Sequence, residues 1–229
     1  MTRFVLIHGY VEDPTIFDQL VPLLPPADVL RLDLQAEFTR WQPAGPVSAR
    51  SLAQYLTDTY QLTATDVLIG HSMGGWVAIN IKELTGATVI QLGSWTDQRK
   101  INFPVRRLSV LRFMVRTGLT QSRPLIWLFQ KMYPFRESYD LHYRLVEGMG
   151  RQPRRYLRQQ LETLFAPVPP LTVQPDLRVH ARPDNIVFCP DEPYEAVPGD
   201  HFCLVYHAPV VAERISACLN RSARPAPAT

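Results

Sequence analysis

The sequence predicts an α/β fold with a mostly parallel central sheet, flanking helices and a helical cap insertion. Over the first 95 residues, short apolar runs alternate with helical patterns, which is typical of βαβ units and a parallel sheet. From residue 95 to about 170 only helical periodicity remains. The 229 residues are 46% apolar and 20% charged. This predicts one globular domain over residues 1–229, with residues 95–170 as its cap.

Each element before the cap has its own signal. Residues 4–7 are a continuous apolar run, as expected of a strand buried on both faces. Apolar residues of 15–24 share one helical face, and the two prolines that follow stop that helix. Residues 35–46 are expected to form a loop, and Ser48 is expected to cap a helix that reaches Leu62. The remaining elements here are strands at 29–32, 66–70 and 87–92 and a helix over 74–84.

Strand signals return after the cap. Residues 177–180 and 194–197 are short runs typical of strands, and a last helix is expected over about 209–219. These elements complete a sheet whose strands run mostly parallel and are covered on both faces by helices.

One motif carries chemistry. Gly70-His71-Ser72-Met73-Gly74 fits G-x-S-x-G and lies between an expected strand and an expected helix. A chance match is common in loops, so this context is what makes the motif informative. The turn is so tight that the serine backbone is strained, and the elbow glycines Gly70 and Gly74 supply the space it needs. The strain projects the Ser72 hydroxyl above the carboxyl edge of the sheet.

Three segments together resemble the α/β-hydrolase family, and the resemblance covers nearly the whole chain. They are His8-Gly9 after the first strand, the Gly-His-Ser-Met-Gly-Gly run at 70–75, and Gly199-Asp200-His201-Phe202 before the last helix. Each segment alone is a weak signal. In this order and on these elements, they imply a serine hydrolase with a catalytic triad.

A serine nucleophile needs a base that takes its proton and a third group that holds the base. The resemblance implies Ser72 as nucleophile and His201 as base, because His201 precedes the last helix as the family's histidine does. His207 is the competitor, but it opens that helix, where a cap or surface role is expected. The other histidines are expected to make structural contacts: His8, His71, His142 and His180.

The triad acid has three candidates. Asp184 follows the strand at 177–180, where the family usually carries the acid, and it keeps the chain order Ser, acid, His. Many thioesterases and the cofactor-free dioxygenases of the family place the acid after the preceding strand, but residues 92–94 contain no carboxylate and Asp97 comes a few residues later. The short stretch between Asp184 and His201 leaves little room for the usual helix. Asp97 and Asp191 therefore stay open as alternatives.

Two backbone N–H groups should stabilise the oxyanion of an acyl-transfer intermediate. One is that of Met73, directly after the nucleophile. The family's HG-x turn implies that the other comes from the loop after the first strand, where Tyr10 is preferred and Val11 is the fallback. Aromatic side chains offer candidate pocket walls, namely Trp95 and Trp127. Trp76 is expected in the core, although Ser-x-Gly-Gly-Trp also resembles the elbow of cofactor-free ring dioxygenases.

Charge is unevenly distributed along the chain. Residues 94–170 hold 14 Lys and Arg against 5 Asp and Glu, whereas the net charge of the chain is only +3. Such a region is compatible with an anionic substrate or a membrane surface, but we favour solvated helix faces because the arginines are scattered. No nucleic-acid motif accompanies them, so no nucleic-acid partner is expected.

Other classes of protein lack support in the sequence. No apolar run approaches the ~18 residues of a membrane span, and the N-terminal run is too short for a signal peptide. A cytoplasmic protein is therefore expected. The sequence has no nucleotide-binding or metal-binding motif, so no cofactor and no metal are expected. The sequence does not specify the oligomeric state.

The favoured function is hydrolysis of a small carboxylic ester through an acyl-enzyme intermediate. An acyl thioesterase is the first alternative, because residues 197–202 and 207–208 resemble the histidine region of such domains. A lyase or cofactor-free dioxygenase on the same fold is the second, and a non-catalytic binding protein is the third. The partner is expected to be a small-molecule ester or thioester, whose acyl-chain length the sequence does not specify.

Overall fold

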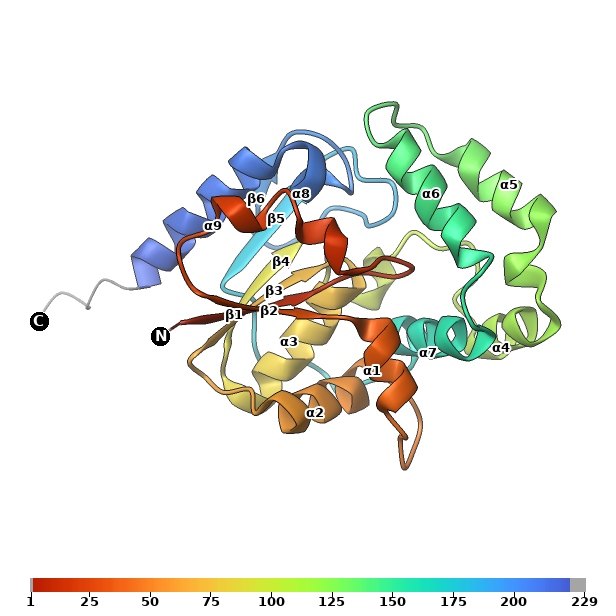
Figure 1. Ribbon diagram of the computed structural model, residues 1–229, viewed down its shortest axis with the longest axis horizontal. Helices are drawn as coiled ribbons and strands as arrows, with labels where there is room; N and C mark the ends of the chain where they lie inside the picture. Colours follow the sequence, from red (N-terminus) through yellow and green to blue (C-terminus); the bar gives the residue numbers. More distant parts are fainter. Residues whose placement is uncertain (1, 223–229) are drawn as a thin grey trace, which may run out of the picture.

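The buried apolar runs of the sequence form one six-stranded sheet in which every pair of neighbours is parallel. The computed structural model describes residues 2–222 (Figure 1). The strand order is β2-β1-β3-β4-β5-β6, which confirms the predicted α/β class with a parallel sheet. The strands are β1 (Arg3–Ile7), β2 (Asp28–Leu32), β3 (Asp66–His71), β4 (Thr88–Leu92), β5 (Leu177–Ala181) and β6 (Glu195–Val197).

The register aligns the carboxyl ends of the central strands. Ile7 at the end of β1 pairs with Gly70 of β3, and His71 at the end of β3 pairs with Leu92 of β4. Because parallel strands end at the same edge of the sheet, the loops after β1, β3, β4 and β5 meet there. This is the edge at which ligands bind in open α/β sheets.

Helices cover both faces of the sheet (Figure 1). Side chains alternate along β1, so Val5 and Ile7 belong to one core and Phe4 and Leu6 to the other. The first core includes side chains of α2 and α3, and the second includes side chains of α9. The helices outside the insertion are α1 (Leu34–Arg40), α2 (Ala49–Tyr60), α3 (Met73–Thr85), α8 (Cys203–Tyr206) and α9 (Ala208–Ser222).

The segment between β4 and β5 is helical, as the sequence predicts. It extends from the sheet at one end of the molecule (Figure 1). Its last helix packs against α3, where the Trp76 indole donates to the main-chain oxygen of Thr163 at 3.1 Å. Trp76 is buried, as expected. The helices of this insertion are η3 (Gln98–Lys100), α4 (Leu108–Thr117), η4 (Leu119–Gln121), α5 (Arg123–Met132), α6 (Tyr139–Met149) and α7 (Arg154–Phe165). Within the described residues, none of the helices is long and apolar enough to cross a membrane.

Two of the predicted elements are wrong. The helix predicted over residues 15–24 is two 3₁₀ turns, η1 (Pro14–Phe17) and η2 (Val21–Leu23). Pro22 explains the break, because proline lacks the N–H that an α-helix needs. The loop predicted over 35–46 contains α1, whose N-cap Asp33 accepts hydrogen bonds from the first helical N–H groups. The predicted Ser48 cap of α2 is confirmed.

Candidate active site

The predicted nucleophile elbow lies where β3 ends and α3 begins. Ser72 has φ 51° and ψ −121°, an unfavourable backbone conformation for a residue with a side chain. The elbow glycines are required by the packing, because a Cβ at Gly74 would lie 1.8 Å from the Ile7 oxygen and one at Gly70 would lie 2.4 Å from the Gly75 nitrogen. Ser94, which follows β4, donates from its hydroxyl to the main-chain oxygen of Ser72 at 2.7 Å and so stabilises the turn.

Asp184 and His201 meet at the same edge. His201 Nδ1 lies 2.7 Å from Asp184 Oδ2, and both side chains are buried. The other carboxylate oxygen, Asp184 Oδ1, accepts from the N–H groups of Ile186 at 2.8 Å and Val187 at 2.9 Å. Asp184 is therefore fixed by its own loop, and it fixes the imidazole, whose Nε2 has no hydrogen-bond partner among residues 2–222.

The pKa values of this pair are shifted in opposite directions. Burial disfavours the charged carboxylate of Asp184, but the charge and hydrogen bond of His201 outweigh it, so the pKa of Asp184 is lowered. Burial also disfavours the charged His201, but Asp184, with a smaller contribution from Glu12, outweighs it, so the pKa of His201 is raised. Each partner stabilises the charged form of the other.

The alternative acids, Asp97 and Asp191, and the alternative base, His207, have partners other than Asp184 and His201. Asp97 caps η3 and pairs with Arg99. Asp191 has a side chain that is 87% exposed and pairs with Lys100. The competing base His207 has Glu137 as its carboxylate partner, at 3.0 Å. The structure thus joins His201 to Asp184 and to neither Asp97 nor Asp191.

Ser72 is also buried, with 5% of its surface exposed. Within residues 2–222, no hydrogen bond joins Ser72 Oγ to His201 Nε2. Such bonds are often long in unliganded enzymes and shorten when substrate binds. Gly93 lies beside this pair, and a Cβ there would be in ordinary van der Waals contact with His201 Nδ1 at 3.4 Å and Asp184 Oδ2 at 3.6 Å. Its left-handed backbone, with φ 52°, is what favours glycine at this position.

The loop after β1 faces the elbow. Met73 is the first residue of α3, and the first N–H groups of a helix have no acceptor within it. No hydrogen bond in the described part of the chain engages the Tyr10 N–H, whereas the Val11 N–H donates to Gln160 Oε1 of α7 at 2.8 Å. Among the described residues, the Tyr10 and Met73 N–H groups thus have no acceptor, whereas the N–H of Val11, the fallback, has one.

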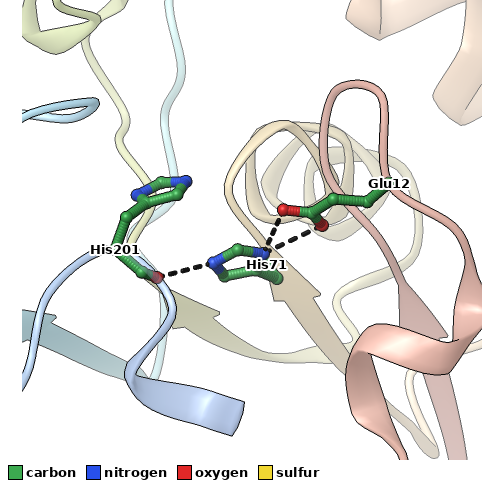
Figure 2. A group of neighbouring side chains, drawn as sticks. All are labelled: Glu12, His71 and His201. Atoms are coloured by element: carbon green, nitrogen blue, oxygen red, sulfur yellow. Dashed lines mark hydrogen bonds and ion pairs between the residues drawn. The ribbon is translucent and has the colours of Figure 1, made fainter. Parts of the chain in front are cut away.

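Sequence reasoning missed Glu12 as a residue of this site. Glu12 follows β1, and its carboxylate is buried against His71, the last residue of β3 (Figure 2). His71 Nδ1 lies 2.9 Å from both carboxylate oxygens, and His71 Nε2 lies 2.9 Å from the main-chain oxygen of His201. No local motif indicates the role of Glu12, because its side-chain partner His71 is 59 residues away along the chain.

These three residues also offer ligand atoms within 4.8 Å of one another, which is a possible arrangement for a metal ion. Both ring nitrogens of His71 are already engaged by protein oxygens. Nδ1 of His201 is engaged by Asp184. The arrangement therefore fits a hydrogen-bonded network better than a set of open metal ligands.

The candidate pocket walls differ in exposure. Trp95 is buried in the core at 2% exposure, and Trp127 on α5 is 59% exposed. The Tyr10 hydroxyl contacts Met149 Sδ of α6 at 3.6 Å.

A cavity of about 330 Å³ adjoins the site at Glu12 and is bordered by Arg144 of α6. A larger hollow of about 830 Å³ surrounds Arg3 and Asp66 at the amino ends of the strands, away from Ser72.

Comparison with known proteins adds the family and the fold. A sequence model described as "Alpha/beta hydrolase family" matches residues 4–218. No protein with a curated description matches the chain.

The chain is also similar to many solved structures. The enol-lactonase from Burkholderia xenovorans is 16% identical with a TM-score of 0.73, over 96% of this chain and 91% of that one. A thermophilic esterase from Thermogutta terrifontis is 18% identical with a TM-score of 0.69, over 96% and 90%. A hydrolase from Oleispira antarctica is 14% identical with a TM-score of 0.67, over 97% and 90%. At these identities the similarity establishes the fold alone.

Proposed function

Because the chain belongs to the alpha/beta hydrolase family, we propose that it is a serine hydrolase that cleaves a small carboxylic ester through an acyl-enzyme intermediate. The observation that carries the proposal is the buried 2.7 Å contact between His201 Nδ1 and Asp184 Oδ2. This pair lies at the sheet edge where Ser72 occupies the strained elbow. A nucleophile, a base and an orienting acid are the three groups that acyl transfer from an ester requires.

The first half-reaction forms the acyl-enzyme. His201 Nδ1–H donates to Asp184, which leaves Nε2 able to take the Ser72 proton while Oγ bonds to the ester carbonyl carbon. The carbonyl oxygen becomes an oxyanion that accepts from the Tyr10 and Met73 N–H groups. When the tetrahedral intermediate collapses, the C–O bond to the alcohol breaks and the His201 imidazolium protonates the departing alkoxide.

The second half-reaction releases the acid. His201 Nε2 takes a proton from water, and the resulting oxygen nucleophile bonds to the acyl carbon. The same two N–H groups hold the second oxyanion. Its collapse breaks the bond to Ser72 Oγ, which recovers its proton from His201. The reaction needs no cofactor, and the proposed partner is a small-molecule ester.

The position of the acid favours an ester over a thioester. In the thioesterases that the sequence resembles, the acid follows the strand that corresponds to β4. That place holds Ser94, whose hydroxyl supports the Ser72 carbonyl instead. The thioesterase alternative keeps one observation in its favour, the basic insertion between β4 and β5. The similar structures include an esterase and an enol-lactonase, which agrees with ester chemistry.

Covalent labelling tests the proposal. A fluorophosphonate probe should label the wild-type protein, and mass spectrometry should find the adduct on Ser72. Ser72→Ala should abolish labelling and the hydrolysis of p-nitrophenyl acetate. His201→Ala should lose at least ~10³-fold in kcat, whereas the matched variant His207→Ala should stay close to wild type. An adduct on another residue, or equal labelling of Ser72→Ala, would refute the assignment.

A further inference from the structure

The proposed hydrolysis leaves two buried ionisable side chains of the site without a role, Glu12 and His71. We propose that they form an ion pair that positions the catalytic histidine and the oxyanion loop, and that removing only the cationic partner harms catalysis most. The inference rests on the proposed function and adds two positioning residues to it. Neither side chain is needed to react with substrate.

The protonation of His71 follows from its two neighbours (Figure 2). Its Nε2 lies 2.9 Å from the main-chain oxygen of His201. A carbonyl oxygen has no proton to donate, so Nε2 must carry one. Its Nδ1 lies 2.9 Å from both oxygens of Glu12. Glu12 Oε2 already accepts from the Gly9 N–H at 2.5 Å. When Glu12 is a carboxylate, both of its oxygens accept, so Nδ1 also carries a proton and His71 is the cationic partner of the proposed ion pair.

Burial makes this pair interdependent. The side chains of His71 and Glu12 are 0% and 3% exposed. Burial disfavours the charged carboxylate of Glu12, but the charge and hydrogen bond of His71 outweigh it and lower its pKa. A buried charge that loses its partner is strongly unfavourable, whereas neutralising both partners is often tolerated. The two residues should therefore behave as one unit when they are replaced.

The pair joins three segments that are distant in the sequence. Glu12 comes from the loop after β1, His71 from the end of β3, and His201 from the loop before α8 (Figure 2). His71 holds the main chain of His201, and its ring lies 4.8 Å from the His201 ring, centroid to centroid. Glu12 holds the Gly9 N–H and so fixes the turn that presents the next N–H, that of Tyr10. One hydrogen-bonded chain thus sets both the base and the oxyanion donor.

The same geometry explains why Glu12 must be neutralised. A Cβ at Gly9 would lie 2.7 Å from Glu12 Oε2 and 2.9 Å from Ser72 Cβ, so the carboxylate and the nucleophile lie on the same side of this glycine. A free carboxylate beside the elbow would repel the oxyanion that forms on the substrate. The His71 charge cancels that repulsion as long as both partners are present.

Three variants give the test. In Glu12→Gln, the amide oxygen can accept from Gly9 and the amide nitrogen can donate to a neutral His71, whose Nε2–H still reaches His201. This variant should stay within about tenfold of wild type in kcat. His71→Gln removes the cation and leaves the carboxylate, and it should lose about 10²- to 10³-fold, the size of a lost oxyanion donor. The double variant should recover about tenfold over His71→Gln. All effects should fall on kcat with little change in KM.

A control separates positioning from loss of stability. Asp66 is a buried carboxylate at the other end of β3, where it pairs with Arg3 at 2.7 Å. Asp66→Asn should lower the melting temperature and leave kcat unchanged. If His71→Gln is no worse than the double variant, or if Asp66→Asn lowers kcat as much, the proposed role is wrong.

A second measurement does not depend on activity. In the Ser72→Ala protein, ¹H–¹⁵N NMR at pH 7 should find two slowly exchanging ring N–H protons on His71, and only one after Glu12→Gln is added. One ring N–H before that change would overturn the ion pair, even if His71→Gln fails to fold. The two proposals fail separately, because undiminished hydrolysis by Ser72→Ala would refute the proposed nucleophile without altering the NMR result.

Discussion

Replacing Asp184 with asparagine tests the proposed triad most directly. Asp184 Oδ1 accepts from two main-chain N–H groups, those of Ile186 and Val187, while Oδ2 accepts from His201. In Asp184→Asn, the amide oxygen must therefore take the Oδ1 position, and the amide NH₂ must face His201 Nδ1. That nitrogen is then forced to accept, the ring proton moves to Nε2, and the imidazole can no longer take a proton from Ser72.

The size of the effect follows from the cost of the opposite rotamer. Turning the amide over would leave the N–H groups of Ile186 and Val187 unsatisfied in a buried place, at about 1–3 kcal/mol each. Together these are about 2–6 kcal/mol, or a factor of about 30 to 10⁴ against the productive tautomer. The equivalent change in the best-studied triad costs about 10⁴ in kcat. We therefore expect kcat to fall by about 10²- to 10⁴-fold with KM nearly unchanged.

The assay is steady-state hydrolysis of p-nitrophenyl acetate, with the rate of fluorophosphonate labelling as a second reading. Matched controls are Asp97→Asn and Asp191→Asn, which remove carboxylates that pair with Arg99 and Lys100. Both should stay within about twofold, as expected of exposed ion pairs. The reasoning is refuted if Asp184→Asn keeps more than a tenth of wild-type kcat, or if Asp97→Asn is the severe variant.

Three further predictions concern pH, packing and salt. Because the pKa of His201 is raised and its neutral form is the base, kcat/KM should rise with pH through an acidic limb centred above 6.5; a limb below that value contradicts it. Gly74→Ala should prevent folding or strongly lower the melting temperature, since its Cβ would meet the Ile7 oxygen, whereas Gly148→Ala in open space on α6 should stabilise by about 1 kcal/mol; equal melting temperatures would count against the elbow geometry. Raising ionic strength should leave kcat/KM for a neutral p-nitrophenyl ester flat and turnover of an acyl-coenzyme A poor; a steep fall for the thioester alone would support the thioesterase alternative.

The sheet could be predicted from the sequence because each strand has a local signal in its own residues. A continuous apolar run such as residues 4–7 is what a strand buried on both faces requires. The same local logic identified the elbow, because strand, turn and helix lie within a few residues of Ser72. The prediction of a helix over 15–24 was wrong because it relied on the spacing of apolar residues and gave too little weight to Pro22. Proline has no N–H to donate within an α-helix, and this is known from the sequence alone. The helix α1 was missed because it has only seven residues.

The site was less predictable where contacts join distant segments. The order Ser, acid, His led to Asp184 by resemblance, but nothing in the order of residues excludes Asp97 or Asp191. Geometry distinguishes them, because only Asp184 among the three contacts His201. The hydrogen bonds of His71 cross 59 residues to Glu12 and 130 residues to His201. A single sequence contains no signal for pairs of this kind.

The segment that follows Asp184 shows how the insertion takes part in the site. Residues 182–194 contain no helix, as the short spacing to His201 predicts. In place of a helix, the first residues of the insertion brace this loop: Ile101 and Val187 form an antiparallel bridge, and the Phe188 N–H donates to the Lys100 oxygen at 2.8 Å. Val187 also donates to Asp184 Oδ1. Asp184 is therefore held by a loop that is itself bonded to the start of the insertion. A change in this part of the insertion should act on the orientation of His201 as well as on substrate choice.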